Sequence, residues 1–261
     1  MPDAAPETPI YEQAHPTIGG YMRQQRLLQG LTQKQVADAL FMSKSAYQKY
    51  ENEERNPTVP VIRQWCDALD LRYDKRRRVM SIVMGELAPW AVGSPEAITP
   101  DALEFIDSMP YPAYLHRVPQ YDVLAANAAA NEMCPFLDPA LGTPERPINV
   151  IVQMMTDPRA EKILVNWEPI VHRMIYGLRE FSAGVVPAAE VAAVYEACRS
   201  HSRFEYMWNN PMDPAVFDDD HVIMLDPSGR QTNWRMRSLQ SLHPWCDYEI
   251  FLLTPRSAPA P

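Results

Sequence analysis

Two short segments between residues 32 and 52 limit most strongly what this chain can fold into, because each carries its own helix start signal. Thr32 and Gln35 have the T-x-x-Q spacing of a capping box, in which the two side chains satisfy free backbone amides at a helix start. The apolar positions of Val36–Leu40 follow with helical spacing. Ser43 can cap a second helix. The sequence therefore predicts two short helices joined by a turn.

Two short helices cannot bury a core without neighbours, so flanking helices are required. Pro60 suits the first turn of the helix that follows the pair. Residues 17–88 are therefore predicted to form an all-helical domain. The residues expected to face its core are Ile18, Met22, Gln25, Ala46, Tyr47, Tyr50, Val61, Ile62, Trp65 and Leu69.

The outer face of the second helix has side chains suited to nucleic acid. Lys44 and Lys49 can donate to guanine edges or phosphates, and Gln48 can pair with adenine through two hydrogen bonds. Gln33 and Asn52 lie at the helix ends, where they can reach phosphates. A polar solvated face is the alternative. The predicted DNA-binding residues are Gln33, Ser43, Lys44, Ser45, Gln48, Lys49 and Asn52.

The net charge of −9 is unevenly distributed. Residues 17–88 hold 12 Lys+Arg and 8 Asp+Glu, whereas residues 89–261 hold 12 and 22. Only the first, mildly basic part is suited to following a phosphate backbone. The basic run 74–78 is interpreted as a solvated face. Contact with the acidic part of the chain or with flanking phosphates is the alternative.

The first domain resembles the lambda-repressor-like (XRE, Cro-type) helix-turn-helix family over residues 18–71. The resemblance implies that Arg26 and Glu51 pair beneath the recognition helix. Phe41 stands where the family usually has Gly in the turn, so we expect an altered turn and a tilted recognition helix. The matching residues are Arg26, Gly30, Leu31, Thr32, Gln33, Ala37, Ser43, Tyr50, Glu51, Asn52, Arg55, Asn56 and Pro57.

The rest of the chain divides by composition. Residues 1–16 are predicted to be a disordered arm, 89–96 a linker and 97–256 a second domain. Helices are expected at 100–109, 149–181 with a restart at Pro158, and 187–200. Strands are expected at 111–117, 121–126, 221–225, 231–242 and 248–254, with a turn at 226–229.

The longest pattern is a predicted helix over 157–182 with one broad apolar face, interpreted as core, and a kink at Pro169. His172, Tyr176 and Arg179 share its polar flank. We interpret this stripe as solvated. A pocket rim or a dimer seam is the alternative.

Nothing in the sequence indicates catalysis, a metal or a cofactor. There is no nucleophile–base pair and no glycine-rich phosphate loop, and 218–221 is interpreted as an acidic loop before a strand. His243 and Cys246 alone make a poor metal site. The widely spaced cysteines are expected to be reduced, structural thiols: Cys66, Cys134, Cys198 and Cys246.

The second domain is rich in bulky side chains that can line a cavity for an apolar ligand or fill a core. It resembles the MmyB-type ligand-binding domain over residues 97–256, which implies a PAS-like fold and a fatty-acid-like ligand. The residues that match this family best are Asn127, Trp167, Leu178, Arg179 and Phe204 to Trp208. The predicted ligand-binding residues are Trp167, Met174, Leu178, Arg179, His172, Phe204 and Trp208.

The predicted fold is an all-α N-terminal helix-turn-helix domain followed by an α+β PAS-like C-terminal domain. The predicted function is that of a cytoplasmic repressor that binds double-stranded DNA at a palindromic operator as a homodimer. A small apolar or amphiphilic ligand would modulate it, with no membrane association because no long apolar run occurs. A C-terminal domain that binds a protein partner is the first alternative, and an enzyme with an accessory DNA-binding domain is the second.

Overall fold

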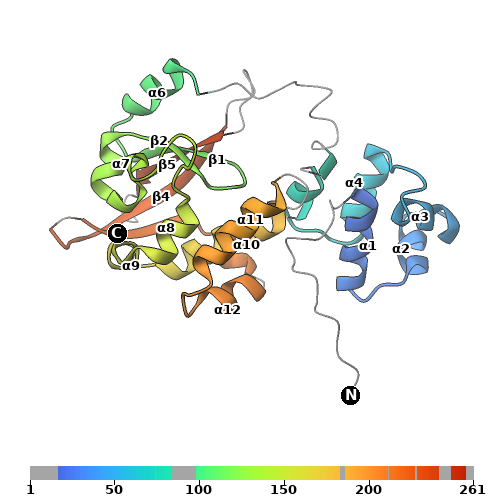
Figure 1. Cartoon of the computed structure of the whole chain (residues 1–261). Helices are drawn as coiled ribbons and strands as arrows, with labels where there is room; N and C mark the ends of the chain where they lie inside the picture. Colours follow the sequence, from blue (N-terminus) through green and yellow to red (C-terminus); the bar gives the residue numbers. More distant parts are fainter. Residues whose placement is uncertain are drawn as a thin grey trace, which may run out of the picture. The chain divides into compact units, whose positions relative to one another are not determined.

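The computed structural model describes residues 17–73, 75–80, 82–83, 98–182, 186–210, 212–226, 228–240 and 248–256. The predicted arm 1–16 and linker 89–96 lie outside the described residues. The chain divides into two compact units, one holding the described residues up to 83 and the other those from 98 onwards. Figure 1 shows both units, which are described separately.

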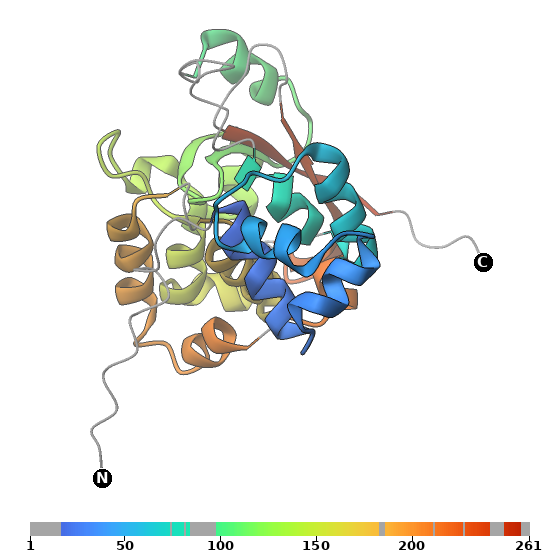
Figure 2. The same cartoon turned by 90° about the vertical axis from the view of Figure 1, so that its right-hand side faces the viewer.

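The N-terminal unit is helical, as predicted (Figure 2). Its helices are α1 (Ile18–Leu28), α2 (Gln33–Ala39), α3 (Lys44–Glu51) and α4 (Val59–Ala68), and residues 75–80 and 82–83 are also helical. Of the ten residues predicted to face its core, Ala46, Val61 and Ile62 are half-buried and the others are buried. The buried core consists of Ile18, Tyr21, Met22, Val36, Ala37, Leu40, Tyr47, Tyr50, Trp65, Cys66, Leu69, Leu71, Val79 and Ile82.

The predicted start signals of α2 and α3 are confirmed. The Thr32 hydroxyl accepts from the Gln35 amide, and the Gln35 side chain accepts from the Thr32 amide, which completes the capping box. The Ser43 hydroxyl accepts a hydrogen bond from the Ala46 amide. These bonds satisfy amides that would otherwise lack partners at the two helix starts.

The turn between α2 and α3 passes through Phe41 in the left-handed region, with φ of 54°. This is the conformation that glycine adopts without steric cost. The Phe41 side chain is 90% exposed, so it meets no packing conflict. The expected alteration of the turn and tilt of the recognition helix stay predictions, and the strain of this backbone angle lies at Phe41 itself.

The interpretation of the basic run 74–78 as a solvated face is wrong for Arg78. Arg78 is only 2% exposed. The Arg76 guanidinium donates to Asp67 Oδ1 at 2.7 Å and to the backbone oxygen of Leu71 at 2.6 Å. Arg78 therefore faces the core, while the half-exposed Arg76 side chain connects its own helix to the end of α4.

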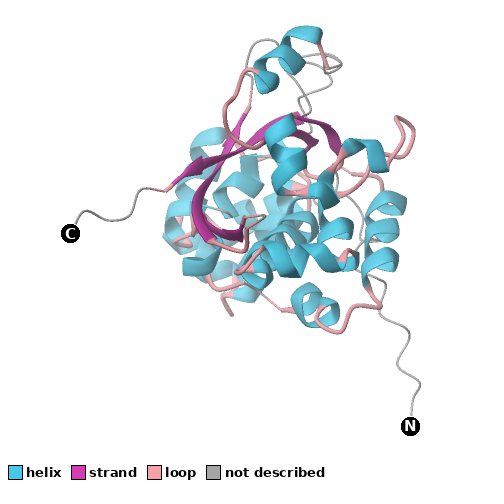
Figure 3. Ribbon diagram, turned by 90° about the vertical axis from the view of Figure 1, so that its left-hand side faces the viewer, coloured by secondary structure: helices cyan, strands magenta, loops and turns pink. Residues whose placement is uncertain are grey.

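The C-terminal unit is built on one five-stranded antiparallel sheet in the order β2-β1-β5-β4-β3. All five strands occur where the sequence predicts them: β1 (Ala113–Arg117), β2 (Val123–Ala126), β3 (His221–Leu225), β4 (Gln231–Leu239) and β5 (Tyr248–Pro255). The predicted turn between β3 and β4 is closed by the Gly229 amide, which donates to the Asp226 oxygen at 2.8 Å. Figure 3 shows the strands as a curved layer against the helices.

Helices lie on both sides of this sheet. On one side, α6 (Pro100–Asp107), capped by Thr99 as predicted, packs Ile106 against Ala113 and Leu115 of β1. Towards the other side lie α7 (Ala128–Met133), α8 (Val150–Thr156), α9 (Pro158–Ile163) and α10 (Trp167–Ser182) (Figure 1). The unit also contains α11 (Ala188–Cys198), α12 (Phe204–Asn209), α13 (Pro214–Phe217) and short 3-10 helices at Pro135–Leu137 and Pro139–Leu141.

The predicted continuous helix 157–182 is wrong, because the chain leaves helical conformation between α9 and α10. There Leu164 forms a β-bridge with Met224, and the Val165 amide donates to the Ile223 oxygen at 2.8 Å. The predicted kink at Pro169 is also wrong. Pro169 is the third residue of α10, where the backbone amide would have no partner within the helix.

Asn127 connects three elements of this unit. Its Oδ1 accepts from the amides of Ala113 and Ala130, at 3.1 and 2.9 Å. Its Nδ2 donates to the backbone oxygens of Ile106 and Tyr111, at 3.0 and 2.9 Å. The side chain is buried and fully engaged, so it fixes the end of α6, the start of β1 and the start of α7 relative to one another.

Candidate DNA interface and ligand cavity

A buried ion pair braces α3 from beneath, as the family resemblance implies. Arg26 Nε and Nη2 donate to the two carboxylate oxygens of Glu51, at 2.6 and 2.8 Å. Arg26 Nη1 donates to the Leu31 oxygen at 2.9 Å. The Glu51 side chain is only 1% exposed. This two-pronged geometry connects α1, the turn after it and the end of α3.

Gln33, at the start of α2, joins this pair. Its Nε2 donates to Glu51 Oε2 at 2.9 Å. Burial would raise the pKa of Glu51, but the hydrogen bonds from Arg26 and Gln33 hold it below its ordinary value. The hydrogen bond to Glu51 raises the pKa of Arg26. The phosphate contact predicted for Gln33 stays a prediction, and one of its amide hydrogens is already engaged.

The outer face of α3 is free of packing, as a DNA-reading face requires. Lys44, Ser45, Gln48 and Lys49 are all exposed, while Tyr47 and Tyr50 on the opposite side are buried. The predicted contacts at the ends of α3 are also exposed. Ser43 caps the helix and Asn52 Nδ2 donates to Glu54 Oε1 at 3.1 Å. The outer face of α3 therefore presents the ammonium groups of Lys44 and Lys49 and the side-chain amide of Gln48.

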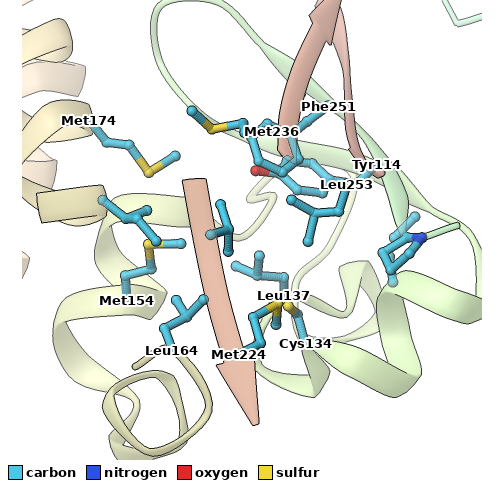
Figure 4. Close-up of a pocket in the computed structure, with 15 residues that line it drawn as sticks. Tyr114, Cys134, Leu137, Met154, Leu164, Met174, Met224, Met236, Phe251 and Leu253 are labelled. Atoms are coloured by element: carbon cyan, nitrogen blue, oxygen red, sulfur yellow. The ribbon is translucent and has the colours of Figure 1, made fainter. Parts of the chain in front are cut away.

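The C-terminal unit contains a partly enclosed cavity between the sheet and the helices that lie over it (Figure 4). Its lining is apolar almost throughout, and every strand contributes to it. The residues that line it are Pro112, Tyr114, Ala126, Ala130, Cys134, Leu137, Met154, Leu164, Ile170, Met174, Val222, Met224, Met236, Phe251 and Leu253.

The cavity is small but its walls can move. Its volume is about 40 Å³, which is room for only a few water molecules, since one needs roughly 10–15 Å³. Four of its lining residues are methionines, namely Met154, Met174, Met224 and Met236. Methionine has three rotatable bonds and no branching, so it can repack around a guest. An apolar lining of this kind favours an apolar ligand over water.

The structure places only Met174 of the predicted ligand-binding residues on the cavity wall. Trp167 is buried beside it, where its Nε1 donates to the Met154 oxygen at 2.8 Å. Leu178, Phe204 and Trp208 are buried, and the rings of the last two pack against each other at 5.6 Å. None of these last three is among the lining residues.

The polar flank of α10 faces α12 and the residues after it. Arg179 Nη1 donates to the Trp208 oxygen, and His172 Nε2 lies 3.4 Å from the Asn210 oxygen. Tyr176 is buried. The interpretation of this stripe as solvated is therefore wrong, because a second helix that the sequence did not reveal covers it. His172 and Arg179 are absent from the cavity lining.

The alternation of side chains between the two faces of each strand is the sequence signal that could have indicated the cavity. Val222 and Met224 on β3, and Phe251 and Leu253 on β5, are spaced by two residues and point to the same side of the sheet. These residues led to the prediction of strands, and no face of the sheet was assigned from them.

Other predicted features have plain structural roles. The loop 218–221 is tied down by arginines: Arg173 donates to the Asp219 oxygen and Arg237 Nη1 to Asp220 Oδ2. Cys66, Cys134 and Cys198 are free thiols, and burial raises the pKa of each. Cys246 and His243 lie outside the described residues.

Within the described ranges, no helix has the length and apolarity to cross a membrane.

Comparison with protein families gives two matches. A helix-turn-helix family model matches residues 22–75. The model of the MmyB-like transcription regulator ligand binding domain matches residues 98–244, more than half of the chain. No curated protein matches the chain. The protein therefore belongs to the MmyB-like transcription regulators, and it is a DNA-binding transcription regulator with an N-terminal helix-turn-helix and a C-terminal ligand-binding domain.

Proposed function

We propose that this regulator binds a palindromic operator as a homodimer in the cytoplasm, and that an apolar or fatty-acid-like ligand in the C-terminal cavity alters its affinity for DNA. The observation that carries the proposal is the apolar cavity, joined in one chain to a DNA-reading helix. We place the DNA-binding domain at 17–88 and a PAS-like ligand-binding domain at 97–256. A five-stranded antiparallel sheet with helices over a cavity supports the second assignment. Repression is proposed because it requires only that the protein occupy its operator.

The chemistry of the cavity favours an elongated apolar ligand. Each methylene that leaves water for an apolar site contributes about 0.8 kcal/mol. The ligand would meet Ile170 and Met174 of α10 on one side and Met224 and Leu253 of the sheet on the other. Because the cavity is small, a longer tail must displace methionine side chains. Affinity should therefore rise with chain length and then level off.

The alternative, a C-terminal domain that binds a protein partner, would be favoured by a broad exposed apolar patch. The partly enclosed cavity favours a small molecule instead. Native mass spectrometry of the purified full chain tests the proposal directly. We expect a dimer that carries one apolar small molecule per chain. A ligand-free monomer that also fails to take up added apolar compounds would contradict it.

Gln48 is expected to read a base. Replacing it with Ala should cost about 1–3 kcal/mol on the operator and relax the preference at one position, because a two-bond contact with a base edge is lost. Lys34→Ala is the control, since Lys34 is exposed on α2 and pairs with Asp38 at 2.7 Å. Binding to a randomised operator library measures both. An unchanged sequence preference in Gln48→Ala would remove Gln48 from the interface.

DNA binding is expected to need two copies of the chain. One recognition helix of eight residues contacts only a few base pairs, so specificity requires two half-sites about one helical turn apart. Footprinting should show protection of a near-palindrome, and log affinity should fall linearly with log salt. Full-affinity protection of one asymmetric half-site by a monomer would contradict the prediction.

A further inference from the structure

Phe41 combines two unfavourable features on the surface of the N-terminal unit. Its backbone has φ of 54°, a left-handed conformation that costs free energy for residues other than glycine. Its side chain is 90% exposed, so almost the whole ring lies in water. A single exposed apolar side chain is common, but a bulky one on a left-handed backbone is an outlier. Glycine at this position would remove both costs, so the ring calls for a functional explanation.

The end of α2 requires this backbone conformation at Phe41. The Phe41 amide donates to the Asp38 oxygen at 3.1 Å, and the Met42 amide donates to the Ala37 oxygen at 3.0 Å. These two hydrogen bonds form a Schellman motif, which ends a helix through one left-handed residue, usually glycine. The Met42 side chain then packs against the core. The backbone is therefore fixed on both sides of Phe41, and the ring projects from a well-defined turn.

The other described non-glycine residues at positive φ differ from Phe41 in their side chains. Glu53 and Asp70 are polar and exposed. Tyr121 stacks its ring on that of His116, with the ring centroids 5.5 Å apart. Among the described residues at positive φ, only Phe41 exposes a large apolar side chain. Its ring is therefore free to contact a partner.

The charges near Phe41 in the sequence favour a polyanion as that partner. Lys44 and Lys49 are exposed on α3, and no ion pair holds either of them within the described part of the chain. Asp38, the nearest acid in the sequence, is already paired with Lys34 at 2.7 Å. The turn thus leads directly into the cationic outer face of α3 (Figure 1). Continuity with this face favours DNA over a protein surface.

Phe41 lies close enough to α3 to contact the same stretch of DNA. Consecutive Cα atoms are about 3.8 Å apart, so the Cα atoms of Phe41 and Lys44 are separated by at most about 11 Å. Bases along a strand are spaced by about 3.4 Å, so Phe41 lies within about three base pairs of the base that Lys44 would contact. The apolar group that the major groove offers is the C5-methyl of thymine, which phenylalanine can contact.

We propose that Phe41 contacts the methyl group of a thymine in each half-site of the operator, and so adds a base preference beside those of Lys44 and Gln48. The inference rests on the proposed function, because it requires that the outer face of α3 lie in the major groove. Binding covers a ring that is exposed in the free protein, which makes the contact favourable. Because the contact is apolar, it adds affinity without releasing counterions.

The test compares Phe41→Gly with the wild-type full chain on an operator selected from a random pool. The variant loses the ring and relieves the backbone, so hydrogen exchange should show α2 and α3 at least as protected as in the wild type. Operator affinity should fall at least about 15-fold, since each of two half-sites loses an apolar contact that contributes about fourfold. The slope of log affinity against log salt should stay the same. Leu28→Ala is the control, because Leu28 is 70% exposed at the end of α1 and should not affect operator affinity.

Replacing operator thymines by uracil, symmetrically in both half-sites, identifies the base. At one position, the missing methyl should weaken wild-type binding about 15-fold and Phe41→Gly binding less than about twofold. Equal losses in the two proteins at every position, or no loss in the wild type, overturn the thymine contact. Wild-type affinity in Phe41→Gly also overturns it and leaves the ring for a protein partner. A wild-type chain that selects no operator overturns the proposed function itself, and the Phe41 contact with it.

Discussion

Replacing Glu51 with Gln is expected to destabilise the N-terminal unit by about 3–5 kcal/mol, because it leaves the buried Arg26 charge without its counterion. Domains of this size are stable by only about 5–15 kcal/mol, so α2 and α3 should lose most of their protection. Hydrogen exchange followed by mass spectrometry on the full chain reports this unit apart from the C-terminal one. DNA binding should fall in parallel.

An exposed ion pair provides the control for this prediction. Lys34 and Asp38 lie 2.7 Å apart on α2, with more than 60% of each side chain exposed. Asp38→Asn should therefore cost at most about 0.5 kcal/mol. A cost below about 1 kcal/mol for Glu51→Gln, similar to that of the control, would show that the buried pair does not hold the unit together.

The same pair predicts how the unit responds to acid. The pKa of Glu51 is lowered in the folded chain, so its contribution to stability is present above its ordinary value and is lost as the pH falls through the lowered value. Exchange protection of α3 should thus decline on acidification below about pH 4.3. Glu51→Gln should show a shallower decline over this range. Identical pH profiles would exclude Glu51 as the titrating group.

Filling the cavity is expected to weaken ligand binding strongly. Ala130 is buried on α7 and lines the cavity, so Ala130→Leu places a larger side chain in the space that a ligand tail would use. Exclusion of four methylenes costs about 3 kcal/mol, which corresponds to roughly a 100-fold loss of affinity for decanoic acid. The overpacked core should itself cost about 1–3 kcal/mol.

Ala128→Leu is the matched control for this change. Ala128 lies on the same helix but is exposed and outside the lining, so the substitution should leave affinity unchanged. Calorimetry with decanoic acid measures both variants. Tight binding by a folded Ala130→Leu protein would place the ligand elsewhere.

The N-terminal unit could be predicted from the sequence because its signals are local. The hydrogen bonds of Thr32 and Ser43 reach residues three positions away, and helical periodicity identifies the core positions directly. The pairing of Arg26 with Glu51 spans 25 positions. It was expected through the family resemblance and not through spacing.

The ligand cavity could not be located from the sequence, because it depends on contacts between distant segments. Leu164 is not helical, because it forms a β-bridge with Met224 of β3. No local sequence pattern around Leu164 indicates this bridge. Of the apolar residues of α10 that were predicted to bind the ligand, Met174 lines the cavity, whereas Trp167 and Leu178 do not. In the structure those two side chains fill core beside the cavity and do not line it.

We propose that a ligand in the C-terminal cavity changes DNA binding by the N-terminal helix-turn-helix. The most direct test measures the affinity of the full chain for an operator, selected from a random pool, with and without saturating decanoic acid. In the wild-type protein, the acid should change the operator affinity about 5- to 150-fold. In Ala130→Leu, the same concentration of acid should leave the operator affinity unchanged. An operator affinity that stays the same in wild-type protein shown by calorimetry to have bound the acid would contradict it.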